Sequence, residues 1–102
     1  MYQADAHSAL DQLRATYLKS LGQKTSEFSD AMQRRDFPAL TRLGHQLKGS
    51  GLSYGYPEVS ELGARIEEAG QHRSLLLLDP LRVQYEELVD RLTENQPVVV
   101  KP

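Results

Sequence analysis

The residue types that could do chemistry in this sequence gather around one histidine, His45. Lys48 and Gly49 follow it by three and four residues, a spacing that puts all three on one face of a helix. Residues 37–57 contain no Asp or Glu, although the whole chain carries 14 Asp+Glu against 12 Lys+Arg. The charge near His45 is therefore locally positive, which suggests an anionic partner or group. A single histidine is by itself more often an incidental residue, so the hypothesis depends on these neighbours.

Three glycines, Gly44, Gly49 and Gly51, lie in the same stretch. Inside a helix each costs about 0.8–1.0 kcal/mol relative to alanine, so each needs a compensating reason. Gly49 lies one turn after His45 on the exposed face, where a missing side chain would let a protein backbone or a phosphate oxygen come close. Gly44 and Gly51 are expected to allow tight packing between helices.

Other motifs for binding or catalysis do not fit this sequence. Residues 49–55 are rich in glycine, but their spacing differs from that of a dinucleotide-binding loop and no strand precedes them. The same run lacks the Gly-Lys-Ser/Thr that ends a P-loop. His7, His45 and His72 lie far apart in the sequence, so we expect no metal site.

Helices must position these residues, because apolar residues recur in steps of three, four and seven along most of the chain. The first apolar stripe includes Leu10 and Leu13 and continues to Met32. We expect helices over about 10–32, 37–56, 57–70 and 80–95. His45 lies about 150° from the apolar stripe of its own helix and should therefore face solvent. Short connections and the absence of an alternating strand pattern predict an all-α, antiparallel up-down four-helix bundle.

Residues at the expected helix ends support these boundaries. Asp36, followed closely by a proline, is suited to cap the second helix. Asp79-Pro80 repeats that pattern and predicts the start of the fourth helix, which leaves Leu75–Leu78 as either a packed connector or an extra helical turn. Gly70 is expected to end the third helix, because glycine adopts the left-handed conformation at little cost.

Length and composition restrict the class of protein. A chain of 102 residues predicts one domain over 1–102, with the bundle at about 8–95 and a tail or linker at 96–102. The absence of cysteine excludes a disulfide framework and a thiolate nucleophile. A net charge of -2 gives no general attraction to nucleic acid. No apolar run approaches the roughly 20 residues of a membrane span, so we expect a cytoplasmic protein without direct membrane contact.

The segment 45–55, HQLKGSGLSYG, resembles the signature of histidine-containing phosphotransfer (HPt) domains of two-component phosphorelays. Leucine, lysine and glycine at two, three and four residues after the histidine, and glycine ten residues after it, agree with that family's pattern. The similarity extends upstream through 35–40 and downstream through 62–70. One departure is Gly51, which stands where serine or alanine is common in the family. The resemblance implies a helical bundle and a role in relaying phosphoryl groups.

By this resemblance, His45 would accept a phosphoryl group from an aspartyl-phosphate of one receiver domain and pass it to an aspartate of another. Lys48 would offer positive charge to the phosphoryl oxygens, and Gly49 would keep the approach open. Glu67, 22 residues after the histidine, matches the family position that hydrogen-bonds the ring. From its own helix alone, Glu67 would be interpreted as a solvated surface glutamate, as Glu68 would.

The resemblance also implies the partners, which are response-regulator receiver domains. Receivers would bind a small apolar patch around His45 that includes Gly49 and Leu52, with Thr41 and Arg42 beside it. The chain would need no cofactor of its own, because the receiver supplies both the aspartate and the Mg²⁺. We expect a monomer that does not bind nucleic acid.

The chain has no recognisable nucleotide-binding region and no acidic residue directly after His45, so we expect a covalent phosphoryl carrier without autokinase activity. Both a free-standing protein and the cytoplasmic module of a hybrid histidine kinase in a membrane fit this sequence. The alternative hypothesis is a non-phosphorylated helical adaptor that binds a receiver-like or acidic partner through the same face.

Overall fold

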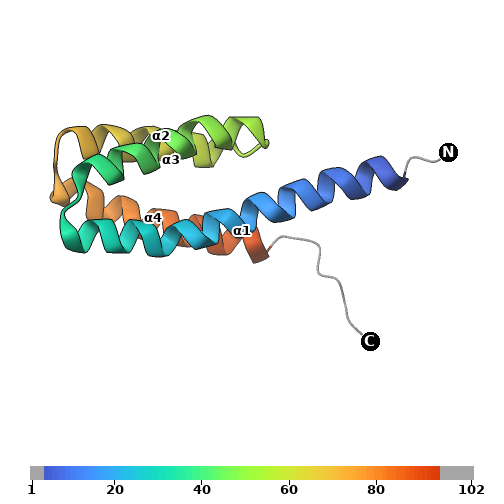
Figure 1. The fold of residues 1–102 in the computed structure, drawn as a ribbon, viewed down its shortest axis with the longest axis horizontal. Helices are drawn as coiled ribbons and strands as arrows, with labels where there is room; N and C mark the ends of the chain where they lie inside the picture. Colours follow the sequence, from blue (N-terminus) through green and yellow to red (C-terminus); the bar gives the residue numbers. More distant parts are fainter. Residues whose placement is uncertain (1–3, 95–102) are drawn as a thin grey trace.

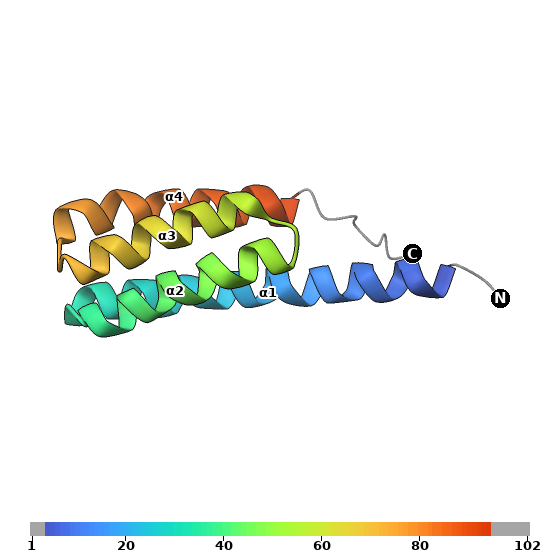
Figure 2. The same ribbon diagram turned by 90° about the horizontal axis from the view of Figure 1, so that it is seen from above.

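The structure is a computed structural model that describes residues 4–94, with side chains described from residue 9 onward. Four helices make up nearly all of this described part. The helices are α1 (Ala4–Arg34), α2 (Phe37–Ser53), α3 (Pro57–Gln71) and α4 (Leu75–Glu94). Each helix runs antiparallel to the one before it, and α4 returns to lie beside α1 (Figures 1 and 2). The predicted antiparallel up-down four-helix bundle is therefore confirmed. The expected tail or linker at 96–102 lies outside the described residues.

The apolar stripes of the four helices meet in one core, as their periodicity predicts. Tyr85 is fully buried in it, with its ring 5.9 Å from that of Phe28 and its hydroxyl donating to the Leu21 carbonyl at 2.5 Å. Burial raises the pKa of Tyr85, so its hydroxyl remains a proton donor and joins α4 to α1. The other largest side chains that are fully buried are Leu21, Leu40, Leu47, Val59, Ile66 and Leu78.

The first helix is longer than its packing partners, and this corrects the expected apolar stripe at its start. Leu10 and Leu13 are 53% and 54% exposed instead of buried. The amino-terminal part of α1 projects beyond the ends of the other helices, so none of the three other described helices covers it (Figure 1). Burial of α1 in the core begins at Tyr17 and Leu18. Periodicity identified the helix correctly but could not show where its neighbours stop.

The start of the second helix agrees with the sequence. The side chain of Asp36 accepts a hydrogen bond from the Ala39 backbone N–H at 3.1 Å, which satisfies one of the free donors of the first turn. Arg35 beside it has a φ of 52°, a left-handed conformation that lets the chain reverse between α1 and α2.

Two other predicted helix ends are wrong. Gly70 does not end α3, because the helix continues to Gln71 and the left-handed residue after it is Arg73, with a φ of 54°. A Cβ on Gly70 would lie 2.6 Å from the Thr41 hydroxyl oxygen, so glycine is required there for contact with α2. The predicted cap Asp79 is inside α4.

The fourth helix begins at Leu75, so Leu75–Leu78 form an additional turn of helix and Pro80 is internal. The hydroxyl oxygen of Ser74 accepts from the Leu77 N–H at 3.1 Å and serves as the cap. Because the helix starts earlier, the Leu78 side chain is fully buried in the core. This burial stabilises the fold, and the local Asp-Pro pattern cannot predict it. Asp79 instead accepts from the Arg82 guanidinium at 3.2 Å on the surface.

Stability measurements can show which of the two predicted cap residues, Asp36 and Asp79, caps a helix. We expect Asp36→Ala to lower the free energy of unfolding by about 1 kcal/mol, because it removes an observed cap. Asp79→Ala should cost less than about 0.5 kcal/mol, since an exposed ion pair contributes little. Urea denaturation followed by circular dichroism measures both. Equal losses for the two variants would contradict this assignment of the caps.

Candidate functional site

A hydrogen-bonded pair joins α2 and α3 on the surface of the bundle. His45 of α2 is 73% exposed, and its Nδ1 lies 3.0 Å from Oε2 of Glu67 on α3. A carboxylate can only accept, so the proton in this bond belongs to Nδ1 of the ring. Nε2 makes no hydrogen bond with any residue from 9 to 94, and in the neutral ring with its proton on Nδ1 it is the nitrogen that carries the lone pair. The arrangement presents an oriented imidazole with one nitrogen available for reaction.

Glu67 also contacts the lysine of the same face. Lys48 Nζ lies 3.6 Å from Glu67 Oε1, so the two carboxylate oxygens face two different groups of α2. The side chain of Glu67 is 18% exposed, which rules out a solvated surface glutamate. Glu68 does lie on the surface, where its carboxylate is 3.9 Å from His72. The positive charge inferred from the sequence of α2 is therefore partly balanced by one carboxylate from α3.

The glycines of α2 have the two roles that the sequence suggested. A Cβ on Gly44 would lie 2.7 Å from Glu67 Cα, and one on Gly51 would lie 2.5 Å from the Ser60 backbone nitrogen, so both glycines permit close helix packing. No atom lies within 4 Å of a Cβ built on Gly49. The space beside His45 is accordingly open.

The other residues predicted at this face lie around His45, and the structure adds contacts for two of them. Thr41 is half-buried, with its hydroxyl against Gly70 of α3 and donating to the Phe37 carbonyl at 2.8 Å. Arg42 is exposed and lines a shallow hollow between α1 and α2. Leu52 is 66% exposed, an apolar side chain without cover from the described residues. Contact with a partner remains a prediction for these residues.

Two polar contacts that support the site were missed by the sequence analysis. Ser60 of α3 is buried and donates from its hydroxyl to the Lys48 carbonyl at 2.5 Å. The Tyr17 hydroxyl of α1 pairs with the Ser50 hydroxyl at 2.8 Å, and burial raises the pKa of Tyr17. Tyr17 also stacks on Tyr54, with ring centroids 4.2 Å apart. Ser60 lies among the apolar residues of its helix, and this position was the sequence feature from which a buried polar contact could have been predicted.

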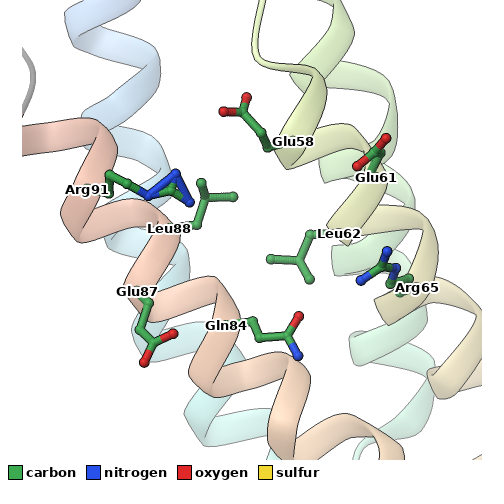
Figure 3. A pocket seen from close by; sticks show the side chains of 8 residues that line it. All are labelled: Glu58, Glu61, Leu62, Arg65, Gln84, Glu87, Leu88 and Arg91. Atoms are coloured by element: carbon green, nitrogen blue, oxygen red, sulfur yellow. The ribbon is translucent and has the colours of Figure 1, made fainter.

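A hollow lined mostly by charged residues lies elsewhere on the molecule, between α3 and α4 (Figure 3). Arg65, one of its α3 residues, is two positions from Glu67 and so points about 200° around the helix from it. Its full lining consists of Glu58, Glu61, Leu62, Arg65, Gln84, Glu87, Leu88 and Arg91. Residues of both charge signs surround it, so the hollow selects no particular ligand charge.

Two general features of the described part of the chain bear on function. Among residues 4–94, no helix is both long and apolar enough to cross a membrane. No group of three or more His, Asp or Glu in that part is arranged to hold a metal ion.

A family model described as the Hpt domain matches residues 12–95. This range contains all four helices except the start of α1, and it includes His45, Lys48 and Glu67. The chain belongs to the Hpt domain family, which confirms the resemblance seen in the sequence. Membership gives the chain a phosphotransfer role in two-component signalling, with response-regulator receiver domains as partners. No curated protein and no solved structure matches the chain.

The contact between Glu67 and His45 can be tested without any partner. We expect Glu67→Ala to lower the fraction of His45 rings protonated at Nδ1, because it removes the one acceptor among residues 9–94 that favours this tautomer. The ¹⁵N chemical shifts of the ring nitrogens at pH 9 measure the tautomer. Glu68→Ala, one residue along the same helix, is the control and should leave the shifts unchanged. Unchanged shifts in Glu67→Ala would show that the pair does not persist in solution.

Proposed function

We propose that this protein is a phosphorelay intermediate that carries a phosphoryl group on Nε2 of His45. The observation that supports this most directly is the bond from Nδ1 to Glu67, because in the neutral ring it places the proton on Nδ1 and leaves the Nε2 lone pair free to attack. An exposed nucleophile on a rigid helix suits transfer between two proteins, because the receiver's aspartate must reach the ring in line with the bond that breaks.

His45 and the aspartyl-phosphate of the receiver supply every bond, electron pair and proton that the transfer step needs. The Nε2 lone pair attacks the phosphorus of the receiver's aspartyl-phosphate, the Nε2–P bond forms, and the P–O bond breaks. The electron pair of that bond leaves with the aspartate, which returns to a carboxylate. The imidazole then carries positive charge with its proton still on Nδ1, where Glu67 accepts the hydrogen bond at 3.0 Å. Passing the group to a second receiver reverses each step.

Lys48 and Gly49 would assist this transfer in different ways. Lys48 Nζ is one turn from His45 and exposed, so it can move from Glu67 to the phosphoryl oxygens when these arrive. Gly49 leaves open the side from which a receiver approaches. Charge neutralisation and positioning are the main requirements of phosphoryl transfer, and the receiver would bring the Mg²⁺.

The receiver would dock on the exposed face of α2 that surrounds His45. Leu52 offers an apolar contact one turn beyond Lys48, and Arg42 offers positive charge on the side toward α1. An interface limited to one helix face is small, which suits a partner that must dissociate after each transfer. We propose a monomeric carrier that alternates between receivers and has no autokinase activity.

Radiolabel transfer tests the carrier function. On incubation with a receiver labelled at its aspartyl-phosphate, we expect label on this chain that is labile in acid and stable in alkali. His45→Gln should reduce the label to background, because the nucleophile is gone. His72→Gln removes another exposed histidine and is the matched control. Label that persists in His45→Gln would rule out this residue, and absence of label from all receivers of the source organism would favour the non-phosphorylated adaptor.

The role of Lys48 can be separated from general surface charge. We expect Lys48→Ala to slow transfer about tenfold, equivalent to about 1.4 kcal/mol at the barrier, because a charged donor to the phosphoryl oxygens is lost. Lys19→Ala removes an exposed lysine of α1 and should leave the rate unchanged. Rapid-quench kinetics measure both variants. Equal rates for wild type and Lys48→Ala, with equal receiver affinity, would contradict this role.

A further inference from the structure

Four glycines line the contact between α2 and α3, two on each helix. Gly44 and Gly51 are seven residues apart on α2, and Gly63 and Gly70 are seven residues apart on α3, so each pair spans two turns of one helix face. A Cβ on any of the four would come within 3.0 Å of an atom of the opposite helix. The two helices therefore pack with their backbones in contact, and no side chain separates them along this line.

Two of these glycines contact the backbone of the residues that form the site. Gly44, which directly precedes His45, packs on the backbone of Glu67, where an added Cβ would be 2.7 Å from Cα and still nearer to the nitrogen. Gly63 packs on the backbone nitrogen of Lys48, and its added Cβ would also lie 2.8 Å from the Gly44 carbonyl oxygen. The Ser60 hydroxyl, which donates to the Lys48 carbonyl, holds the helices together at the next turn.

We propose that Gly44 and Gly63 are positioning residues, which set the separation of α2 and α3 so that Glu67 reaches His45 and Lys48. This inference rests on the proposed function and explains how the reactive ring is oriented. A Cβ at 2.7 Å from Glu67 Cα must move out to about 3.4 Å for ordinary contact, a displacement of at least about 0.7 Å, because the Glu67 nitrogen lies nearer still. The His45–Glu67 bond of 3.0 Å would then exceed normal hydrogen-bond length unless Glu67 rearranged. Glu67 is largely buried and has little room to do so.

Gly51 provides a contrast within the same contact. A Cβ on Gly51 would clash equally, at 2.5 Å from the Ser60 backbone nitrogen, but Ser60 is seven residues from Glu67. An alanine at residue 51 would therefore disturb the packing at the start of α3, away from the His45–Glu67 pair. If the glycines mattered only for stability, Gly51→Ala and Gly44→Ala would have the same consequences for His45.

The experiment compares Gly44→Ala, Gly63→Ala and Gly51→Ala, each in a Gly22→Ala background. Nothing lies within 4 Å of a Cβ on Gly22 in the middle of α1, so that background change stabilises the fold and offsets part of the cost of the clash. The ¹⁵N shifts of the His45 ring at pH 9 are measured first, and phosphoryl transfer from a labelled receiver second. We expect Gly44→Ala and Gly63→Ala to reproduce the ring shifts of Glu67→Ala and to slow transfer about tenfold or more. Gly51→Ala should retain the background's ring shifts, because its clash is with Ser60, which contacts Lys48 and not the His45–Glu67 pair.

The ring shifts decide the inference independently of transfer. Wild-type shifts in folded Gly44→Ala and Gly63→Ala, or equal changes in all three variants, would overturn it. The comparison requires that either Gly44→Ala or Gly63→Ala folds. Failure of both to fold, while Gly51→Ala folds, would also overturn it, because the glycines would then be needed for the bundle itself. A wild-type chain that takes no label would instead refute the proposed carrier function and leave the ring result valid.

Discussion

The backbone contact between α2 and α3 is the constraint on which the site depends. Glycine at 44 and 63 allows the helices to approach until main-chain atoms touch, and only at that separation do Glu67 and His45 lie 3.0 Å apart. The conformational cost of glycine inside a helix is offset by this close packing. A feature that weakens each helix in isolation thus stabilises the pair and orients the ring between them.

The rest of the bundle keeps that helix pair in place. Tyr85 ties α4 to α1 through its bond to the Leu21 carbonyl, and Tyr17 connects α1 to α2 through Ser50. Both tyrosines are buried, so each hydroxyl has found a partner inside the protein. The exposed groups of the site therefore project from helices that are fixed on their inner faces, which suits a reaction that depends on positioning more than on bond polarisation by the protein.

The charges of the site are arranged around a single carboxylate. Glu67 lies 3.0 Å from the imidazole and 3.6 Å from the Lys48 ammonium group, so the free protein has both groups of α2 held by one residue of α3. An arriving phosphoryl group would compete with Glu67 for Lys48 while leaving the bond to Nδ1 intact. In the proposed carrier, the same residue would thus orient the nucleophile and release a cation when the substrate arrives.

Apolar periodicity was sufficient to predict four helices, their antiparallel arrangement and the solvent-facing side of His45, because these follow from local spacing. Asp36 was likewise recognisable as a cap. Helix ends at Gly70 and Asp79, and the burial of Leu10 and Leu13, were predicted wrongly, since each depends on neighbours distant in sequence. The segment 45–55 identified the family by itself. The contact of Glu67 with His45 was implied by the family resemblance but not by the pattern of its own helix. Its geometry, and the requirement for glycine at 63, were decided by the tertiary structure, because both depend on how closely two separate helices pack.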